Sequence, residues 1–153
     1  MPVSQETLLS DEETDAVLGR HETGVLSLAR AGEPYSIPIS YGYDAADRRF
    51  YLRLVSTPGS EKREFLASTP HARLVVYEPD DPVYWSVIAS GTLSEINRDD
   101  LTVDHITQYG AAKRPLFEIW GESRPDLEVR LYELQPDELS GHRIEIDRDE
   151  ASS

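Results

Sequence analysis

The residues best suited to do chemistry lie in the short stretch STPGSEK, residues 56–62. A proline and a glycine interrupt a strand-like segment there, and Ser60 is a favoured N-cap for a helix predicted over 61–67. The first turn of a helix has unpaired backbone N–H groups. Together with the Ser60 hydroxyl and the Lys62 ammonium, these groups would attract an anion such as a phosphate. An ordinary strand-to-helix turn with a solvated Lys62 would explain the same residues, and the spacing is not that of the Walker phosphate loop.

Strand-like sequence on both sides must position this loop. The segment 35–43 alternates strictly, as a strand with one buried face does. Its core face carries Tyr35, Ile37, Ile39, Tyr41 and Tyr43. Its other face carries Ser36, Pro38, Ser40 and Gly42, which are small enough to let a flat group lie against them. Since Pro38 has no N–H to donate, we expect it at a sheet edge or a bulge.

Six or seven predicted strands at short spacing, with few and peripheral helices, indicate a small antiparallel β-barrel, and we expect six strands in it. Further strands are predicted over 24–31, 50–55, 72–78, 84–96, 128–135 and 142–146, and helices over 11–18 and 99–109. We expect 72–78 to be buried on both faces and Gly91 to bend its strand. The expected organisation is a flexible arm over 1–9, one domain over 10–146 and a disordered acidic tail over 147–153.

Composition excludes several classes of protein. The chain of 153 residues has no cysteine, which excludes disulfides, thiolate catalysis and cysteine-bound metals. Its four histidines show no metal-ligand spacing, so no metal site is predicted: His21, His71, His105 and His142. No apolar run approaches the roughly 18 residues of a membrane span, and the polar, acidic N-terminus is unlike a signal peptide. We therefore expect a cytoplasmic protein.

The net charge of −14 argues against nucleic acid and anionic membranes as partners, because an acidic surface repels both. Only Lys62 and Lys113 are lysines, and arginine supplies the other basic residues. Strong acidity with arginine favoured over lysine resembles proteins of salt-loving archaea. Molar salt, with a Debye length of about 3 Å, screens the self-repulsion. An acidic mesophilic protein is the alternative.

Five short motifs occur in a characteristic order along the chain. They are P-Y-x-x-P at 34–38, F-Y-L-R at 50–53, P-G-S-x-K at 58–62, P-x-A-R-L at 70–74 and S-G at 90–91. This order resembles the pyridoxamine 5′-phosphate oxidase-like FMN-binding split β-barrel family. Within that family it is most similar to the branch with nitroimidazole-resistance reductases and FMN-binding proteins of archaea. The resemblance extends from about Leu18 to about Arg143.

The resemblance implies a six-stranded antiparallel split β-barrel and a homodimer with two FMN sites at the subunit interface. The residues expected along the isoalloxazine are Ser36, Ile37, Pro38, Ile39 and Ser40. Arg53 and Leu54 would contact the ribityl chain and phosphate, and the phosphate element corresponds to Ser60, Glu61 and Lys62. Ser86 stands where the oxidases carry a flavin-contacting glutamine. Trp120 is the aromatic residue expected to cover the flavin of the partner subunit.

Three departures from the family pattern bear on function. Glu61 replaces a frequent arginine, so Arg53 is expected to supply the missing charge, and Ser86 is shorter than glutamine. The arginine-rich substrate segment of the oxidases has no match, which argues against pyridoxamine phosphate as substrate. We expect an FMN-dependent oxidoreductase that moves hydride between NAD(P)H and a small acceptor, with no catalytic side chain assigned. The alternatives are a non-catalytic flavin carrier or sensor and an F420-dependent reductase.

Overall fold

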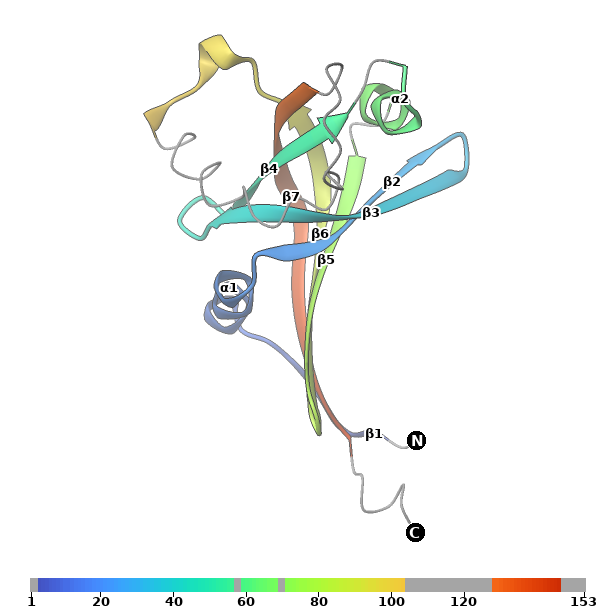
Figure 1. The fold of residues 1–153 in the computed structure, drawn as a ribbon. Coiled ribbons are helices and arrows are strands. Elements are labelled where there is room, and N and C mark those ends of the chain that lie inside the picture. Colours follow the sequence, from blue (N-terminus) through green and yellow to red (C-terminus); the bar gives the residue numbers. More distant parts are fainter. Residues whose placement is uncertain (1–2, 57–58, 69–70, 104–127, 147–153) are drawn as a thin grey trace.

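A ring of antiparallel strands forms the body of the protein (Figure 1). The structure is a computed structural model that describes residues 3–56, 59–68, 71–103 and 128–146. Within these residues the sheet order is β1-β7-β4-β3-β2-β5-β6, and an additional β6–β7 pairing closes β2 to β7 into the ring. The strands are β1 (Val3–Leu8), β2 (Thr23–Arg30), β3 (Glu33–Asp44), β4 (Arg49–Ser56), β5 (His71–Asp80), β6 (Val83–Glu95) and β7 (Glu128–Ile146). The helices are α1 (Asp11–Arg20), α2 (Glu61–Ser68) and the short 3-10 helix η1 (Arg98–Asp100).

The ring of β2 to β7 confirms the predicted antiparallel barrel of six strands. A seventh strand, β1, pairs with β7 outside the ring. The segment expected as a flexible N-terminal arm forms β1, which pairs with the C-terminal part of β7. In Figure 1, β5, β6 and β7 extend together beyond the ring, and β1 lies at the far end of this ribbon. The arm prediction was wrong for β1 because its partner strand is distant in the sequence and no local signal identifies it.

Two strand predictions also need correction. The segments 128–135 and 142–146 belong to one strand, because the residues between them pair with β6 and a register shift opposite Ser90 and Gly91 accommodates the extra residue. That shift confirms the irregularity predicted at Gly91. Strand β5 is buried on one face only: its alternate residues Arg73 and Tyr77 are exposed, because no described element covers that side.

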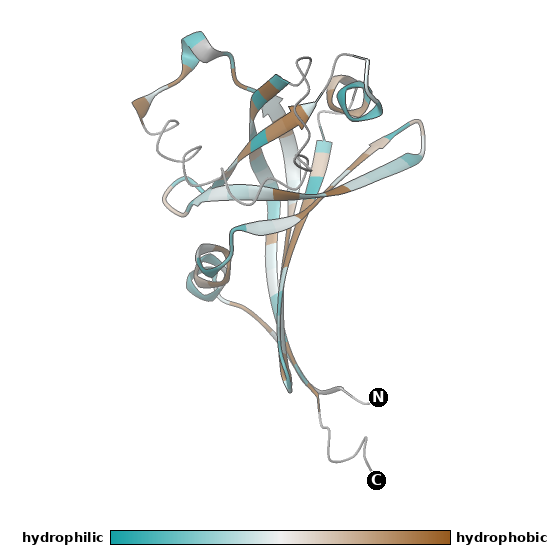
Figure 2. Ribbon diagram, viewed as in Figure 1, coloured by the Kyte–Doolittle hydropathy of each residue, from teal (hydrophilic) through white to brown (hydrophobic). Residues whose placement is uncertain are grey.

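The core fills the inside of the ring. The alternation predicted for 35–43 holds over 35–39, where Ser36 and Pro38 are exposed and Ile39 is buried, but Ser40 and Gly42, expected on the outer face, are buried like Tyr41. Facing residues of the other strands complete the core, among them Leu26, Phe50, Leu52, Leu54, Leu74, Val76, Val87 and Leu134. Figure 2 shows hydrophobic residues along the ring strands, while the β2–β3 turn and much of α2 are hydrophilic.

Helix α1 begins at a capping box, in which Ser10 and Glu13 satisfy each other's backbone N–H groups. It continues beyond the predicted end at 18, through Gly19 to Arg20. The helix predicted over 99–109 and the tail predicted over 147–153 lie mostly or wholly outside the described residues, which show only η1 in that region. No helix in the described part of the chain is long and apolar enough to cross a bilayer.

Candidate functional site

Strands β3 and β4, which carry most of the predicted site residues, pair over a short distance and then separate. Their ladder joins Tyr41–Asp44 to Arg49–Leu52. Beyond it, β3 continues along β2, and β4 continues along β7. Residues 36–40 and 53–56 therefore lie on opposite sides of a split in the sheet. Pro38 is on the stretch of β3 that pairs with β2 alone among the described strands, which confirms its predicted edge position.

The loop after β4 leads into α2 as the sequence predicted. The Arg63 N–H donates a 3.2 Å hydrogen bond to Ser60 Oγ, which makes Ser60 the N-cap. Gly59 precedes it with φ +75°, a backbone conformation that glycine adopts without the steric cost of a Cβ. The helix begins at Glu61, five residues after the last residue of β4.

Two basic side chains of this first turn reach back to the end of β4. Lys62 Nζ donates a 2.7 Å hydrogen bond to the Val55 carbonyl oxygen. Arg63 Nη2 donates a 3.0 Å hydrogen bond to Ser56 Oγ, a hydroxyl that is almost completely buried. Lys62 is therefore half-buried and held by the protein, unlike the solvated lysine of an ordinary turn. Arg53, two residues before Val55, is half-buried and makes no hydrogen bond or ion pair within the described residues.

Arg63 is a site residue that sequence reasoning missed. Arg53 was expected to replace the arginine absent at Glu61, yet Arg63 stands two residues after Glu61 on the same helical turn. A usable signal was present, because residues 53–63 carry three basic residues and one acid in a chain of net charge −14. Glu61 itself is exposed. The segment is thus a local concentration of positive charge.

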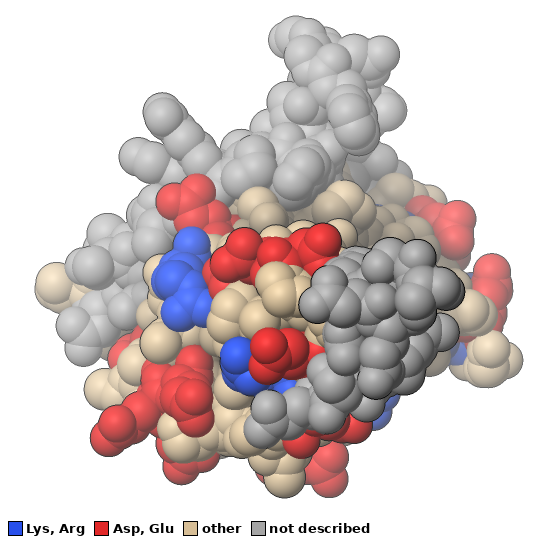
Figure 3. Space-filling model, turned by 90° about the horizontal axis from the view of Figure 1, so that it is seen from below, with Lys and Arg blue, Asp and Glu red and all other residues tan. Residues whose placement is uncertain are grey.

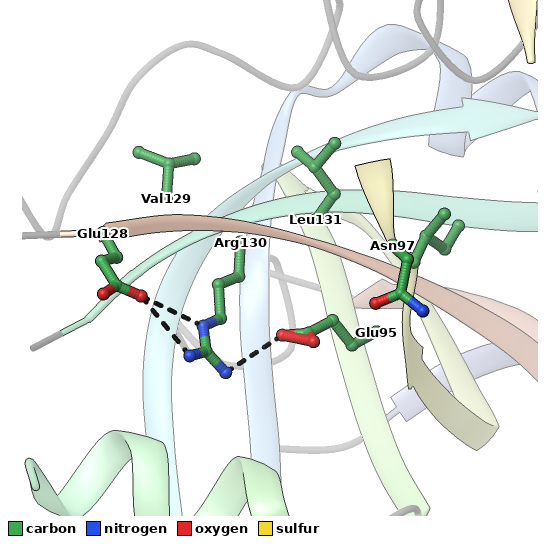
Figure 4. Close-up of a pocket in the computed structure, with 7 residues that line it drawn as sticks. Glu95, Asn97, Glu128, Val129, Arg130 and Leu131 are labelled. Atoms are coloured by element: carbon green, nitrogen blue, oxygen red, sulfur yellow. Dashed lines mark hydrogen bonds and ion pairs between the residues drawn. The ribbon is translucent and has the colours of Figure 1, made fainter. Parts of the chain in front are cut away.

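Arg63 is also the first member of a chain of alternating charges. Its Nη2 lies 3.3 Å from Glu128 Oε2, and the same oxygen accepts from Arg130 at 3.4 Å. Arg130 Nη1 then donates to Glu95 Oε1 at 3.2 Å (Figure 4). Glu128, Arg130 and Glu95 border a cleft of about 590 Å³, whose lining residues are Glu95, Ile96, Asn97, Glu128, Val129, Arg130 and Leu131. The chain of charges connects this cleft to the end of β4.

A known protein family matches most of this chain. The family model described as pyridoxamine 5′-phosphate oxidase matches residues 10–143. The chain belongs to this family. A search of curated proteins found no significant sequence match. The resemblance stated from the motifs is therefore confirmed for the family, while the archaeal source stays a prediction.

Solved structures with the same fold come from several bacteria. An FAD-binding protein of Mesorhizobium loti has 23% sequence identity and a TM-score of 0.73, covering 93% of this chain and 98% of its own. The FAD binding protein of Mycobacterium smegmatis has 16% identity and a TM-score of 0.65, with coverages of 92% and 99%. A protein of Bacteroides thetaiotaomicron assigned to 5-nitroimidazole antibiotic resistance has 12% identity and a TM-score of 0.64, with coverages of 92% and 88%. At these identities the likeness establishes the fold.

The residues expected to contact the cofactor on β3 and β4 differ in their exposure. Ile39 and Leu54 are completely buried in the core, so only their backbone could touch a ligand. Ser40 is buried as well, whereas Ser36 is exposed and its hydroxyl lies 2.9 Å from the hydroxyl of Ser27. Ile37 packs against the core from a partly buried position.

Pro38 borders a second hollow, of about 380 Å³, on the outer side of β2, β3 and β5. Its lining residues are His21, Thr23, Gly24, Val25, Pro38, Tyr77 and Pro79. Tyr77 is 64% exposed, more than the other aromatic side chains that the structure describes. The hollow gives a flat group an apolar surface next to one residue of the predicted cofactor strand.

Ser86 is not brought to the basic cluster of Arg53, Lys62 and Arg63 within one chain. Ser86 lies on the outer side of β6, opposite His142, nine residues before Glu95. That separation is roughly 30 Å along an extended strand, so Ser86 and the Lys62 region lie at different ends of β6. Trp120 lies outside the described residues.

Proposed function

We propose that this protein binds FMN in the split between β3 and β4 and acts as a flavin-dependent oxidoreductase. The observation that carries the proposal is the convergence of Lys62 and Arg63 on the end of β4, in an otherwise acidic chain of the pyridoxamine 5′-phosphate oxidase family. Two proteins of the same fold, from Mesorhizobium loti and Mycobacterium smegmatis, are known as FAD-binding, which supports a flavin as the ligand class.

The chemistry of the basic cluster fits a phosphate monoester. A dianion requires cations and hydrogen-bond donors, and Arg53, Lys62 and Arg63 supply the cations while the first turn of α2 supplies backbone N–H groups. Riboflavin has no phosphate, so the cluster favours FMN over the bare vitamin. The exposed side of β3 at Ser36 and Pro38 presents little side-chain bulk to a flat ring.

When bound, the flavin would supply the hydride chemistry, and the protein would supply binding and orientation. The proposed donor is NAD(P)H and the acceptor a small molecule. A non-catalytic flavin carrier and an F420-dependent reductase use the same fold and are distinguished by experiment. Pyridoxamine phosphate is not proposed as the substrate, because the sequence has no counterpart of the arginine-rich substrate segment.

We also propose a homodimer that covers the outer face of β2, β3, β5 and β6. Four residues that are direct cross-strand partners form an uncharged row on that face: Pro38, Val25, Val75 and Ile88. Direct partners project from the same side of a sheet, so these side chains form one surface. A continuous apolar surface on a strongly acidic protein is a suitable contact for a second copy related by a two-fold axis.

The absorption spectrum of the purified protein tests the cofactor. A flavin spectrum, with FMN identified by mass after release, supports the proposal, and a deazaflavin spectrum supports the F420 alternative. Protein that carries no flavin and does not bind added FMN would overturn it. Oxidation of NAD(P)H by the FMN-loaded protein, with and without an added acceptor, then separates an enzyme from a carrier.

Light scattering in molar KCl tests the dimer. We expect about twice the chain mass, and expect Ile88→Asp to shift the protein toward the monomer because a buried unpaired charge opposes association. A wild-type monomer at micromolar concentration would contradict the dimer.

A further inference from the structure

Glu128 is an acid in direct contact with one of the proposed phosphate cations, Arg63. It pairs with Ser56 at the last rung of the β4–β7 ladder, and Arg63 reaches across that rung. The Arg63 guanidinium donates to Ser56 Oγ at 3.0 Å and to Glu128 Oε2 at 3.3 Å. The Arg63 guanidinium, which the proposed function assigns to phosphate binding, is therefore already paired with a carboxylate.

We infer that Glu128 is an internal competitor for phosphate: its carboxylate holds Arg63 in the free protein and yields it to the phosphate of the incoming ligand. Glu128 thereby sets the affinity for phosphate-bearing flavins without contacting the flavin ring. This inference rests on the proposed function, because it requires phosphate to bind at Arg63.

The neighbouring ion pairs allow Glu128 to release Arg63 without leaving a charged side chain unpaired. Glu128 keeps Arg130 as a partner, and Arg130 keeps Glu95. The Glu128 side chain is 50% exposed, so water can solvate it after the exchange. The loss of its contact with Arg63 therefore costs Glu128 little free energy, whereas a buried ion that loses its partner pays a large desolvation penalty. Arg63 is less exposed, at 17%, and remains anchored by Ser56, which keeps its guanidinium at the same place.

Removing the carboxylate should strengthen phosphate binding. In Glu128→Gln the amide oxygen can still accept from Arg63, so the fold and the position of Arg63 are retained. The negative charge beside the incoming dianion is gone, and Arg63 no longer has to leave an ionic partner. For exposed charges the expected gain in FMN affinity is about two- to fivefold.

The experiment titrates flavin fluorescence against each full-length apo-protein at fixed KCl, with FMN and with riboflavin. Glu128→Gln should bind FMN more tightly and riboflavin as wild type does. Glu95→Gln is the matched control, since it also removes a carboxylate from Arg130 but does not touch Arg63, and its FMN affinity should stay at the wild-type value. Combining Glu128→Gln with Arg63→Gln should abolish the gain, because the competition acts through Arg63.

The results test two hypotheses separately: that phosphate binds at Lys62 and Arg63, and that Glu128 competes with it for Arg63. Wild-type or weaker FMN binding by Glu128→Gln, with FMN binding still sensitive to Lys62→Ala, overturns the competitor role alone. An equal gain in Glu95→Gln, in riboflavin binding or in the Arg63→Gln background also overturns it, because the effect would then be general electrostatics. FMN binding that is insensitive to Lys62→Ala and to Arg63→Gln overturns the phosphate site and the competitor role together.

Discussion

Lys62 Nζ lies 2.7 Å from the main-chain carbonyl oxygen of Val55 and donates a hydrogen bond to it. The contact crosses the loop that joins β4 to α2, so the lysine side chain is ordered before any ligand arrives. Ordering a lysine side chain costs conformational entropy, and a protein that has already met this cost binds its ligand more tightly. The relationship therefore indicates a preorganised cation at the end of β4.

Lys62→Ala should weaken FMN binding roughly ten- to a hundredfold. The substitution removes a charge-assisted contact to the proposed phosphate, which is typically worth about 1.5–3 kcal/mol. Titration of flavin fluorescence against apo-protein in molar KCl measures the change.

Riboflavin is the control for Lys62→Ala. Because it lacks the phosphate, its affinity should hardly differ between wild type and variant. A parallel loss of riboflavin affinity would instead indicate damage to the fold, and unchanged FMN affinity would mean that the phosphate binds elsewhere.

Much of the barrel could be predicted from local patterns. The alternation of 35–43 and the run of apolar positions in 84–96 each determine a buried face, because successive side chains of a strand point to opposite sides. The Ser60 cap and the capping box before α1 are likewise encoded within four residues. The order of motifs then indicated the family and its split barrel, whereas the strand pairings locate the split between β3 and β4.

The features that sequence reasoning missed depend on distant partners. Strand β1 exists through its pairing with β7, and the residues between 135 and 142 are strand because β6 lies beside them. Arg63 was overlooked although the excess of basic residues over 53–63 was visible in the sequence, because its contacts were not. Its place at the site depends on Ser56 and Glu128, which only the folded β4–β7 ladder brings to it.

Gly91→Ala should destabilise the protein by about 3 kcal/mol, the upper end of the usual cost of overpacking. A Cβ at Gly91 would lie 2.0 Å from the Gln135 carbonyl oxygen, and backbone on both strands would have to move. Gly19→Ala is the matched control: a Cβ there meets nothing within 4 Å, and alanine favours a helix, so stability should rise by up to about 1 kcal/mol. Urea unfolding measures both. Equal effects of the two changes would contradict the close packing at the β6–β7 bulge.

Glu78 should make the attachment of α1 to β5 sensitive to acid. Hydrogen bonding from Arg20 holds the pKa of Glu78 below its ordinary value of 4.5, and His21 contributes while burial opposes the shift. Because the folded-state pKa is the lower one, the stabilisation is complete above about pH 4.5 and is lost as pH falls through the folded-state value. The urea midpoint of wild type should therefore exceed that of Glu78→Gln at neutral pH and approach it in acid. Glu138→Gln, at an exposed position with no hydrogen bond or ion pair among the described residues, should show no such convergence.

Salt should stabilise the fold through screening. The chain carries a net charge of −14, and acidic side chains outnumber basic ones over the face shown in Figure 3. In dilute buffer these carboxylates repel one another, whereas at molar KCl the Debye length shrinks to about 3 Å and the repulsion is screened. The thermal unfolding midpoint should therefore climb as KCl rises from tenths molar to molar. Sucrose at matched osmolality is the control, because it favours compact states without screening charge and should raise the midpoint less. A midpoint that does not respond to KCl, or responds equally to sucrose, would remove the physical basis for adaptation to a salt-rich cytoplasm.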